Sequence, residues 1–188
     1  MRDIGTWMKY FSKQGPYKTE GGRNRDCRRI GELNAYCEKH QLQKPIGNQL
    51  GYSLARVKAD TGAHMDTRHM QPAPFIWHKK SQFPVYAFSS QASGLFAKCA
   101  SFDELMTHEG LGAYKDSSNT KLFSADQEIC AKKTVSPNQL ALAALLHSPF
   151  PCFPIIGPRN DKQMQDSLAA ATINLEEKEI AQLFSHWA

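Results

Sequence analysis

One stretch near the end of the sequence constrains the fold more than any other. It opens with a short apolar run over 153–156, long enough for a buried strand. The run stops at Gly157-Pro158, which is a turn signal. Asn160 follows, with Gln163 three residues later, a spacing typical of a helix N-cap and its capping-box partner. The stretch therefore predicts a strand, a tight turn and a helix N-terminus.

The same turn has the features of an anion site. Backbone N–H groups and the positive end of the helix dipole would face it. Gly157 lets the main chain come close to a ligand, and Arg159 has a planar fork that matches phosphate oxygens. The alternative is an ordinary strand-to-helix turn with a solvated arginine. The residues alone leave both interpretations open.

Apolar periodicity, caps and breakers predict the remaining elements. Ser136 is expected to cap a helix in a capping box with Gln139, because Pro137 sits at the first helical position. The stretch 95–121 is expected to be a long loop that contains one short helix. The predicted strands are 17–22, 45–49, 83–88 and 153–156, and the predicted helices are 4–14, 27–40, one ending over 75–80, 102–107, 124–133, 137–146 and 176–187.

Several segments together resemble the aldo-keto reductase family. The run 154–160 with Gln163, preceded by 136–143, is similar to the end of that family's pattern. The segments 34–40, 48–54 and 84–92 are similar to the helix after its fifth strand and to the ends of its sixth and seventh strands. They occur in the family's order and cover nearly the whole chain. The combination is specific, although each segment alone is a weak signal.

The resemblance implies an α/β fold: a partial TIM-type (β/α)8 barrel, roughly its C-terminal half, with parallel strands and outer helices. A complete barrel usually needs about 250 residues, and this chain has 188. We therefore expect residues 1–188 to form one incomplete domain that lacks the first half of the family's pattern. A half barrel leaves sheet edges and an apolar face open, so self-association or pairing with a complementary half barrel is expected.

The resemblance also implies a nicotinamide dinucleotide, NADP(H), as the cofactor. The amides of Asn24 and Gln49 would hold the carboxamide of its ring, Phe88 would stack on the ring, and Arg159 would bind the extra ribose phosphate. Without the resemblance, Gln49 is equally well a buried amide and Phe88 a core residue. The implied cofactor-binding residues are Asn24, Gln49, Phe88, Ser89, Ser90, Gln91, Gly157, Arg159, Gln163 and Ser167.

Three positions depart from the family's pattern, and the catalytic residues cannot be mapped. Arg23 and Arg25 flank Asn24 where the family has a small residue and usually an aromatic one, and Ser167 replaces a common Asn. These departures leave open whether cofactor binding is retained, weakened or lost. The family's Tyr proton donor and its Lys, Asp and His partners belong to the first four strands, and no residue here stands in a matching context.

Two functional interpretations follow. The chain is either an NADP-linked aldo-keto reductase polypeptide, truncated and inactive alone, or a non-enzymatic half-barrel interaction or regulatory module. The net charge of +5 is concentrated in residues 1–44, where arginines cluster over 23–29. A solvated surface explains this cluster better than nucleic-acid binding, because no aromatic residues are interleaved with the arginines.

Other classes of function find little support. His64, His69 and His78 match no metal-binding spacing, so no metal site is expected. Five cysteines without a C-x-x-C pair indicate reduced thiols rather than a disulfide framework or zinc site. No apolar signal region or membrane-spanning stretch is apparent, and a cytoplasmic protein that does not associate with membranes is expected.

Overall fold

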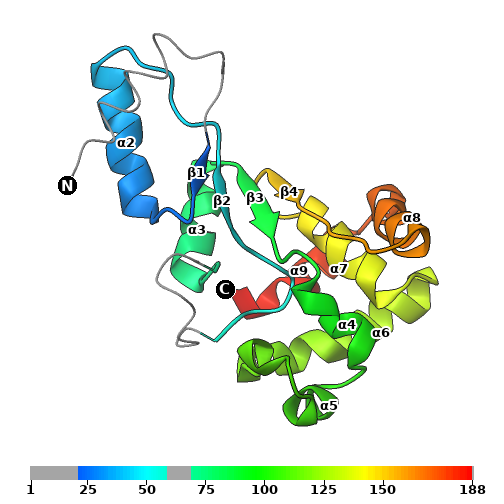
Figure 1. Cartoon of the computed structure of the whole chain (residues 1–188). Coiled ribbons are helices and arrows are strands. Elements are labelled where there is room, and N and C mark those ends of the chain that lie inside the picture. Colours follow the sequence, from blue (N-terminus) through cyan, green and yellow to red (C-terminus); the bar gives the residue numbers. More distant parts are fainter. Residues whose placement is uncertain (1–20, 59–68, 188) are drawn as a thin grey trace.

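The structure is a computed structural model that describes residues 21–58 and 69–187. Within these residues four strands form one sheet in the order β1-β2-β3-β4, and every neighbouring pair is parallel (Figure 1). The strands are β1 (Gly22–Arg23), β2 (Asn48–Gly51), β3 (Val85–Phe88) and β4 (Cys152–Pro154). A parallel sheet requires crossover connections, and helices fill each of them. The predicted α/β fold with parallel strands and outer helices is confirmed.

The helices follow the strands in the expected alternation. They are α2 (Cys27–Lys39), α3 (Pro72–Ser81), α4 (Leu95–Lys98), α5 (Phe102–Thr107), α6 (Thr120–Lys133), α7 (Pro137–Leu146), α8 (Asp161–Ala169) and α9 (Glu177–Leu183). Short 3₁₀ turns join several of them. The helix predicted over 4–14 lies outside the described residues. No helix of the described chain is both long and apolar enough to cross a bilayer.

The two faces of the sheet differ in their surroundings. Leu50, Val85 and Ala87 point toward the helices and are buried in the main hydrophobic core. Because side chains alternate along a strand, their neighbours point to the opposite face. There the register places Gln49, Tyr86 and Phe153 in one row across three strands, and Tyr86 stacks on Phe153 with ring centroids 5.2 Å apart. Phe153 is 51% exposed, so the described residues leave this face partly uncovered.

Capping residues explain where the most clearly predicted helices begin. The Asp26 side chain accepts a hydrogen bond from the Arg28 N–H at the start of α2. Ser136 and Gln139 form the predicted capping box of α7, with donor–acceptor distances of 3.1 Å in both directions. Side-chain caps of this kind satisfy N–H groups that the first helical turn leaves without partners.

The strand boundaries differ from the prediction. β1 begins at Gly22 and includes Arg23, whereas residues 17–20 of the strand predicted over 17–22 lie outside the described chain. β2 covers Asn48–Gly51 rather than 45–49, because its ladder with β3 runs from Asn48 to Gly51. Gln49 is therefore the second residue of β2, and not its C-terminal end as predicted. β4 covers 152–154 instead of 153–156, although the Ile155 N–H still donates to the Ala87 carbonyl.

The stretch 95–121 is more ordered than the predicted loop. The short helix over 102–107 is confirmed as α5, but α4 precedes it and two 3₁₀ turns follow it. α4 has no side-chain cap, and its Leu95 and Phe96 are buried in the core. Burial rather than a local signal therefore holds this segment in place.

The C-terminal segment is fastened to the rest of the fold by polar contacts. Glu179 of α9 is buried, and its carboxylate accepts from Lys132 at 2.7 Å and from Lys133 at 3.0 Å, both on α6. Further along, Arg56 lies over the Trp187 ring and donates to the His186 carbonyl at 3.1 Å. The His186 Nε2 in turn lies 2.8 Å from the Leu54 carbonyl. The Glu179 contacts thus hold α9 against α6, and the Arg56 and Leu54 contacts hold residues 186–187 against the chain that follows β2.

Candidate functional site

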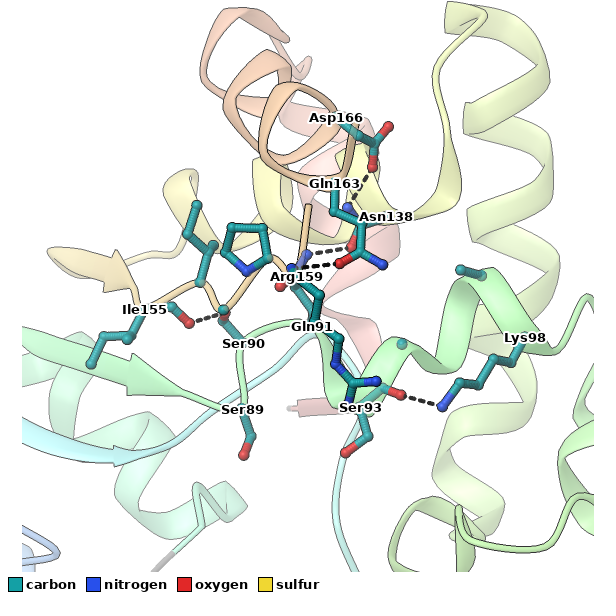
Figure 2. Close-up of a pocket in the computed structure, with 15 residues that line it drawn as sticks. Ser89, Ser90, Gln91, Ser93, Lys98, Asn138, Ile155, Arg159, Gln163 and Asp166 are labelled. Atoms are coloured by element: carbon teal, nitrogen blue, oxygen red, sulfur yellow. Dashed lines mark hydrogen bonds between the residues drawn. The ribbon is translucent and has the colours of Figure 1, made fainter. Parts of the chain in front are cut away.

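A cavity of about 730 Å³ opens where the loops after β3 and β4 meet the first turns of α7 and α8 (Figure 2). In a parallel α/β fold this edge, at the carboxyl ends of the strands, is where ligands bind. Its lining residues are Ser89, Ser90, Gln91, Ser93, Gly94, Ala97, Lys98, Asn138, Ile155, Ile156, Gly157, Pro158, Arg159, Gln163 and Asp166.

Among the described residues, Arg159 and Lys98 bring cationic side chains to the cavity lining. Arg159 comes from the turn between β4 and α8, and Lys98 comes from the last turn of α4. The Lys98 ammonium donates to the Ser93 carbonyl at 2.8 Å, which holds it at the cavity wall. The Arg159 side chain is exposed, so its guanidinium is available for a planar, bidentate contact with an anion. The cavity therefore offers positive charge from two elements.

The turn that carries Arg159 is closed by side chains of α8. Asn160 is the predicted N-cap, because its Oδ1 accepts from the Gln163 N–H at 2.9 Å. The Gln163 Oε1 accepts from the Arg159 N–H at 2.8 Å. The predicted capping-box bond from Gln163 to the Asn160 backbone is thus wrong by one residue, since the side chain reaches back to Arg159 instead. Gln163 couples the position of Arg159 to the helix.

A hydrogen-bonded network joins the loop after β3 to α7 and α8. The Gln91 amide donates to Asn138 at 2.9 Å and to Ser167 at 3.1 Å. Asn138 donates to Asp166 at 2.6 Å, as Figure 2 shows, and Ser136 donates to the other oxygen of Asp166 at 2.9 Å. Asp166 lines the cavity, but these two bonds draw its carboxylate toward α7. The network makes one wall from three elements that lie far apart in the sequence.

The loop after β3 has an unusual backbone. Ser89, Ala92 and Ser93 have φ values of 54°, 50° and 57°, in the left-handed region that residues other than glycine seldom adopt. The Ser90 hydroxyl donates to the Ile155 carbonyl at 2.7 Å and so ties this loop to the segment after β4. Strained backbone of this kind persists where surrounding contacts enforce it and is common at ligand sites.

The cavity has open space beside Gly157. This glycine lies on the lining, and a Cβ added to it would meet no protein atom within 4 Å. Packing within the described chain therefore does not require a glycine at this position. The open space leaves room for a ligand beside the main chain, and the predicted ligand contact at Gly157 stays a prediction.

The predicted site residues fall into two groups. Ser89, Ser90, Gln91, Gly157, Arg159 and Gln163 line the cavity, while Ser167 is buried behind it against Gln91. Asn24, Gln49 and Phe88 are absent from the lining and lie along the neighbouring strands. The Asn24 N–H donates to the Gln49 carbonyl at 2.7 Å, and Phe88 pairs with Gly51 in the register of β2 and β3. The predicted site residues are thus divided between the cavity and the strands β1, β2 and β3 beside it.

Several lining residues were not among the predicted ones, and three of these, Asn138, Asp166 and Lys98, make the polar contacts described above. Asn138 follows the Ser136 N-cap, so the helix start was visible but not its orientation toward the cavity. Asp166 lies three residues after Gln163, which places both on one face of α8. That spacing was a usable signal. No pattern in the sequence indicated Lys98, because the helix that carries it, α4, was not predicted.

The described histidines do not gather. His78 is buried, with its Nδ1 2.8 Å from the Phe83 carbonyl, and burial lowers its pKa. His69 lies against β2 and β3, and His64 is outside the described residues. Across residues 21–58 and 69–187, no cluster of three or more His, Cys, Asp and Glu residues could hold a metal ion.

Comparison with known proteins identifies the family to which this chain belongs. The model of the aldo/keto reductase family matches residues 3–188, and the chain belongs to that family. Among solved structures, it is similar to the thermostable aldo-keto reductase Tm1743, crystallised with the inhibitor epalrestat, with a TM-score of 0.61 and 21% identity. The match covers 96% of this chain and 53% of Tm1743, so the chain spans about half the length of that reductase. No curated protein matches the chain significantly.

Proposed function

We propose that this chain is an NADP(H)-binding polypeptide of aldo-keto reductase type, which carries the cofactor-binding portion of the barrel and has no reductase activity alone. The observation that carries the proposal is the cavity at the carboxyl edge of the sheet, with Arg159 on its rim and Lys98 on its wall. An extra phosphate on the cofactor's ribose needs a cationic fork, and Arg159 supplies one.

The residues present fit such a cofactor from its phosphate end to its ring. The cationic cavity suits the adenosine and phosphate portion, where the first turn of α8 supplies N–H groups and Gly157 a smooth wall. The nicotinamide ring would lie toward Gln49 and Phe88 on the open face of the sheet, near the amide of Asn24. When bound, the cofactor supplies a hydride for carbonyl reduction.

In this proposal, no residue of the described chain serves as the proton donor of that reaction. Tyr52 is buried in the core, its hydroxyl lies 3.2 Å from Ser148, and burial raises its pKa well above the usual value. It therefore packs beneath the sheet instead of lining the cavity. Purified chain is expected to show no NADPH-dependent reduction of a carbonyl substrate, and robust turnover would refute this part of the proposal.

The cofactor preference can be tested at Arg159. Quenching of tryptophan fluorescence measures NADPH and NADH binding to the full chain. Replacing Arg159 by Ala should weaken NADPH binding about ten-fold or more, the effect of losing a charge-assisted contact of about 1.5–3 kcal/mol, and should leave NADH binding nearly unchanged. Arg29→Ala is the matched control, because Arg29 is exposed on α2 and does not line the cavity. Equal losses for both cofactors would contradict the role of Arg159.

One observation favours a second function, a non-enzymatic module that associates with another copy of itself. Phe153 and Ile155 are 51% and 43% exposed, and they alternate with inward residues on the open face of the sheet. An exposed apolar surface of this kind is typical of a binding interface. Light scattering that gives a dimer mass, with a return to monomer mass in Phe153→Ser and no cofactor response in either protein, would favour this function over the first.

A further inference from the structure

His69 lies on the open face of the sheet beside the predicted cofactor-ring residues. It forms a bridge with Gly51, the last residue of β2, and the next residue, Met70, donates its N–H to the Gly51 carbonyl at 2.7 Å. Backbone contacts therefore attach the segment that begins at His69 to the end of β2, and they fix the position of the His69 Cα.

The imidazole ring covers Gly51. A Cβ built on Gly51 would lie less than 3.0 Å from three atoms of this ring, so the ring occupies the space that any side chain at position 51 would take. Gly51 alternates with the core residue Leu50 and therefore points to the face opposite the helices. That face is the one on which Gln49 lies. The glycine is thus explained by the close approach of a ring, and not by a positive φ.

The same ring contacts Phe88. The two ring centroids are 5.7 Å apart with an interplanar angle of 67°, an edge-to-face arrangement. Phe88 pairs with Gly51 in the register, so the imidazole bridges the ends of β2 and β3. Edge-to-face pairs hold two aromatic rings in a defined relative orientation. Burial lowers the pKa of His69, which favours the neutral imidazole that such apolar packing requires.

We propose that His69 is a positioning residue for the nicotinamide ring: together with Phe88 it forms an aromatic corner at the ends of β2 and β3 that receives the ring. This inference rests on the proposed function. His69 acts by holding the Phe88 ring and by closing the space above Gly51, without any chemical step of its own. His69 is outside the cavity lining, and the family match assigns no role to it.

If His69 positions the nicotinamide ring, its replacement should weaken binding of a ligand that contains this ring and not binding of the adenosine phosphate end alone. Calorimetric titration of the full chain with NADPH and with adenosine 2′,5′-bisphosphate separates them, because the bisphosphate has no nicotinamide ring. His69→Ala should weaken NADPH binding about five-fold, the loss of one aromatic pair, and should leave bisphosphate binding unchanged. His69→Phe should restore NADPH affinity to within about two-fold of the original chain, because it restores an aromatic edge. His40→Ala, a histidine replacement on the exposed end of α2, should change neither.

The alternatives give distinct results. Equal losses for both ligands in His69→Ala, or no loss for either, would overturn the positioning role. Rescue by His69→Gln but not by His69→Phe would overturn it too, since the ring would then be replaceable by a polar group. If the original chain binds the bisphosphate but not NADPH, the aromatic corner is refuted and the phosphate end of the proposed function stands. If it binds neither, the proposed function itself fails, and the role of His69 with it.

Discussion

Replacing Asp126 by Asn should make the protein more stable, and increasingly so as the pH rises. Asp126 lies on α6 and is only 4% exposed. No described residue donates a hydrogen bond to its Oδ1. Burial raises the pKa of this carboxyl from 3.8 to about 7, because the folded chain disfavours its charged form. The folded state therefore binds more protons than the unfolded state between these two pH values.

The size of the effect follows from the shift in pKa. Stability falls as the pH rises from about 4 to about 7 and then stays level, since above both pKa values neither state holds the proton. With 3.8 and about 7 as the two pKa values, ionisation reduces the free energy of unfolding by about 1.5 kcal/mol at pH 5 and by about 4 kcal/mol at pH 8. A neutral amide of the same shape does not undergo this loss. The advantage of Asp126→Asn should therefore grow by about 2.5 kcal/mol between the two pH values.

Urea unfolding of both proteins at pH 5 and pH 8, followed by circular dichroism, measures this difference. Asp103→Asn is the matched control, because Asp103 is an exposed carboxylate in the first turn of α5. Its replacement should change the free energy of unfolding by the same small amount at both pH values. An Asp126→Asn variant whose advantage is equal at pH 5 and pH 8 would refute the assignment of a buried, destabilising carboxylate.

Two further predictions concern the C-terminal segment. Burial alone would raise the pKa of Glu179, but hydrogen bonds from Lys132 and from the Glu176 N–H, together with Lys133, lower it to about 2. The stability that the Glu179 carboxylate contributes is present above pH 4.5 and is lost as the pH falls toward 2. Glu179→Gln should therefore reduce the decrease in the free energy of unfolding between these pH values, as measured by urea unfolding. Burial lowers the pKa of His186 from 6.5 to about 4. The free energy of unfolding should therefore fall by about 3 kcal/mol as the pH falls from the first of these values to the second. His186→Gln should remove most of this decrease, as measured by thermal unfolding at pH 7 and pH 4.5.

Local signals in the sequence were sufficient for the elements that carry their own caps or strong apolar patterns. Ser136 with Gln139 located the start of α7, and the apolar run before Ser89 located β3. The family resemblance placed these elements in a parallel α/β arrangement, which the sheet order confirms. The elements that escaped prediction are those that tertiary contacts create. α4 depends on the burial of Leu95 and Phe96 and has no cap.

The candidate site was predictable in part for the same reason. Arg159 and Gly157 lie in a turn that the sequence predicted, and both line the cavity. Gln163 was predicted on the correct helix, but its hydrogen-bond partner could be known only from the geometry of the turn. Lys98 reaches the cavity because α4 packs against the core, and no short motif records such a contact. Long-range packing therefore decides what local patterns leave open.

Calorimetric titration of the full chain with NADPH and with NADH shows whether the cavity binds a nicotinamide dinucleotide and whether it prefers the phosphorylated form. We expect measurable binding of NADPH, with NADH binding weaker by about ten-fold or more because NADH lacks the phosphate that Arg159 would bind. Absence of heat from either cofactor at millimolar concentration, or equal affinity for the two, would contradict it.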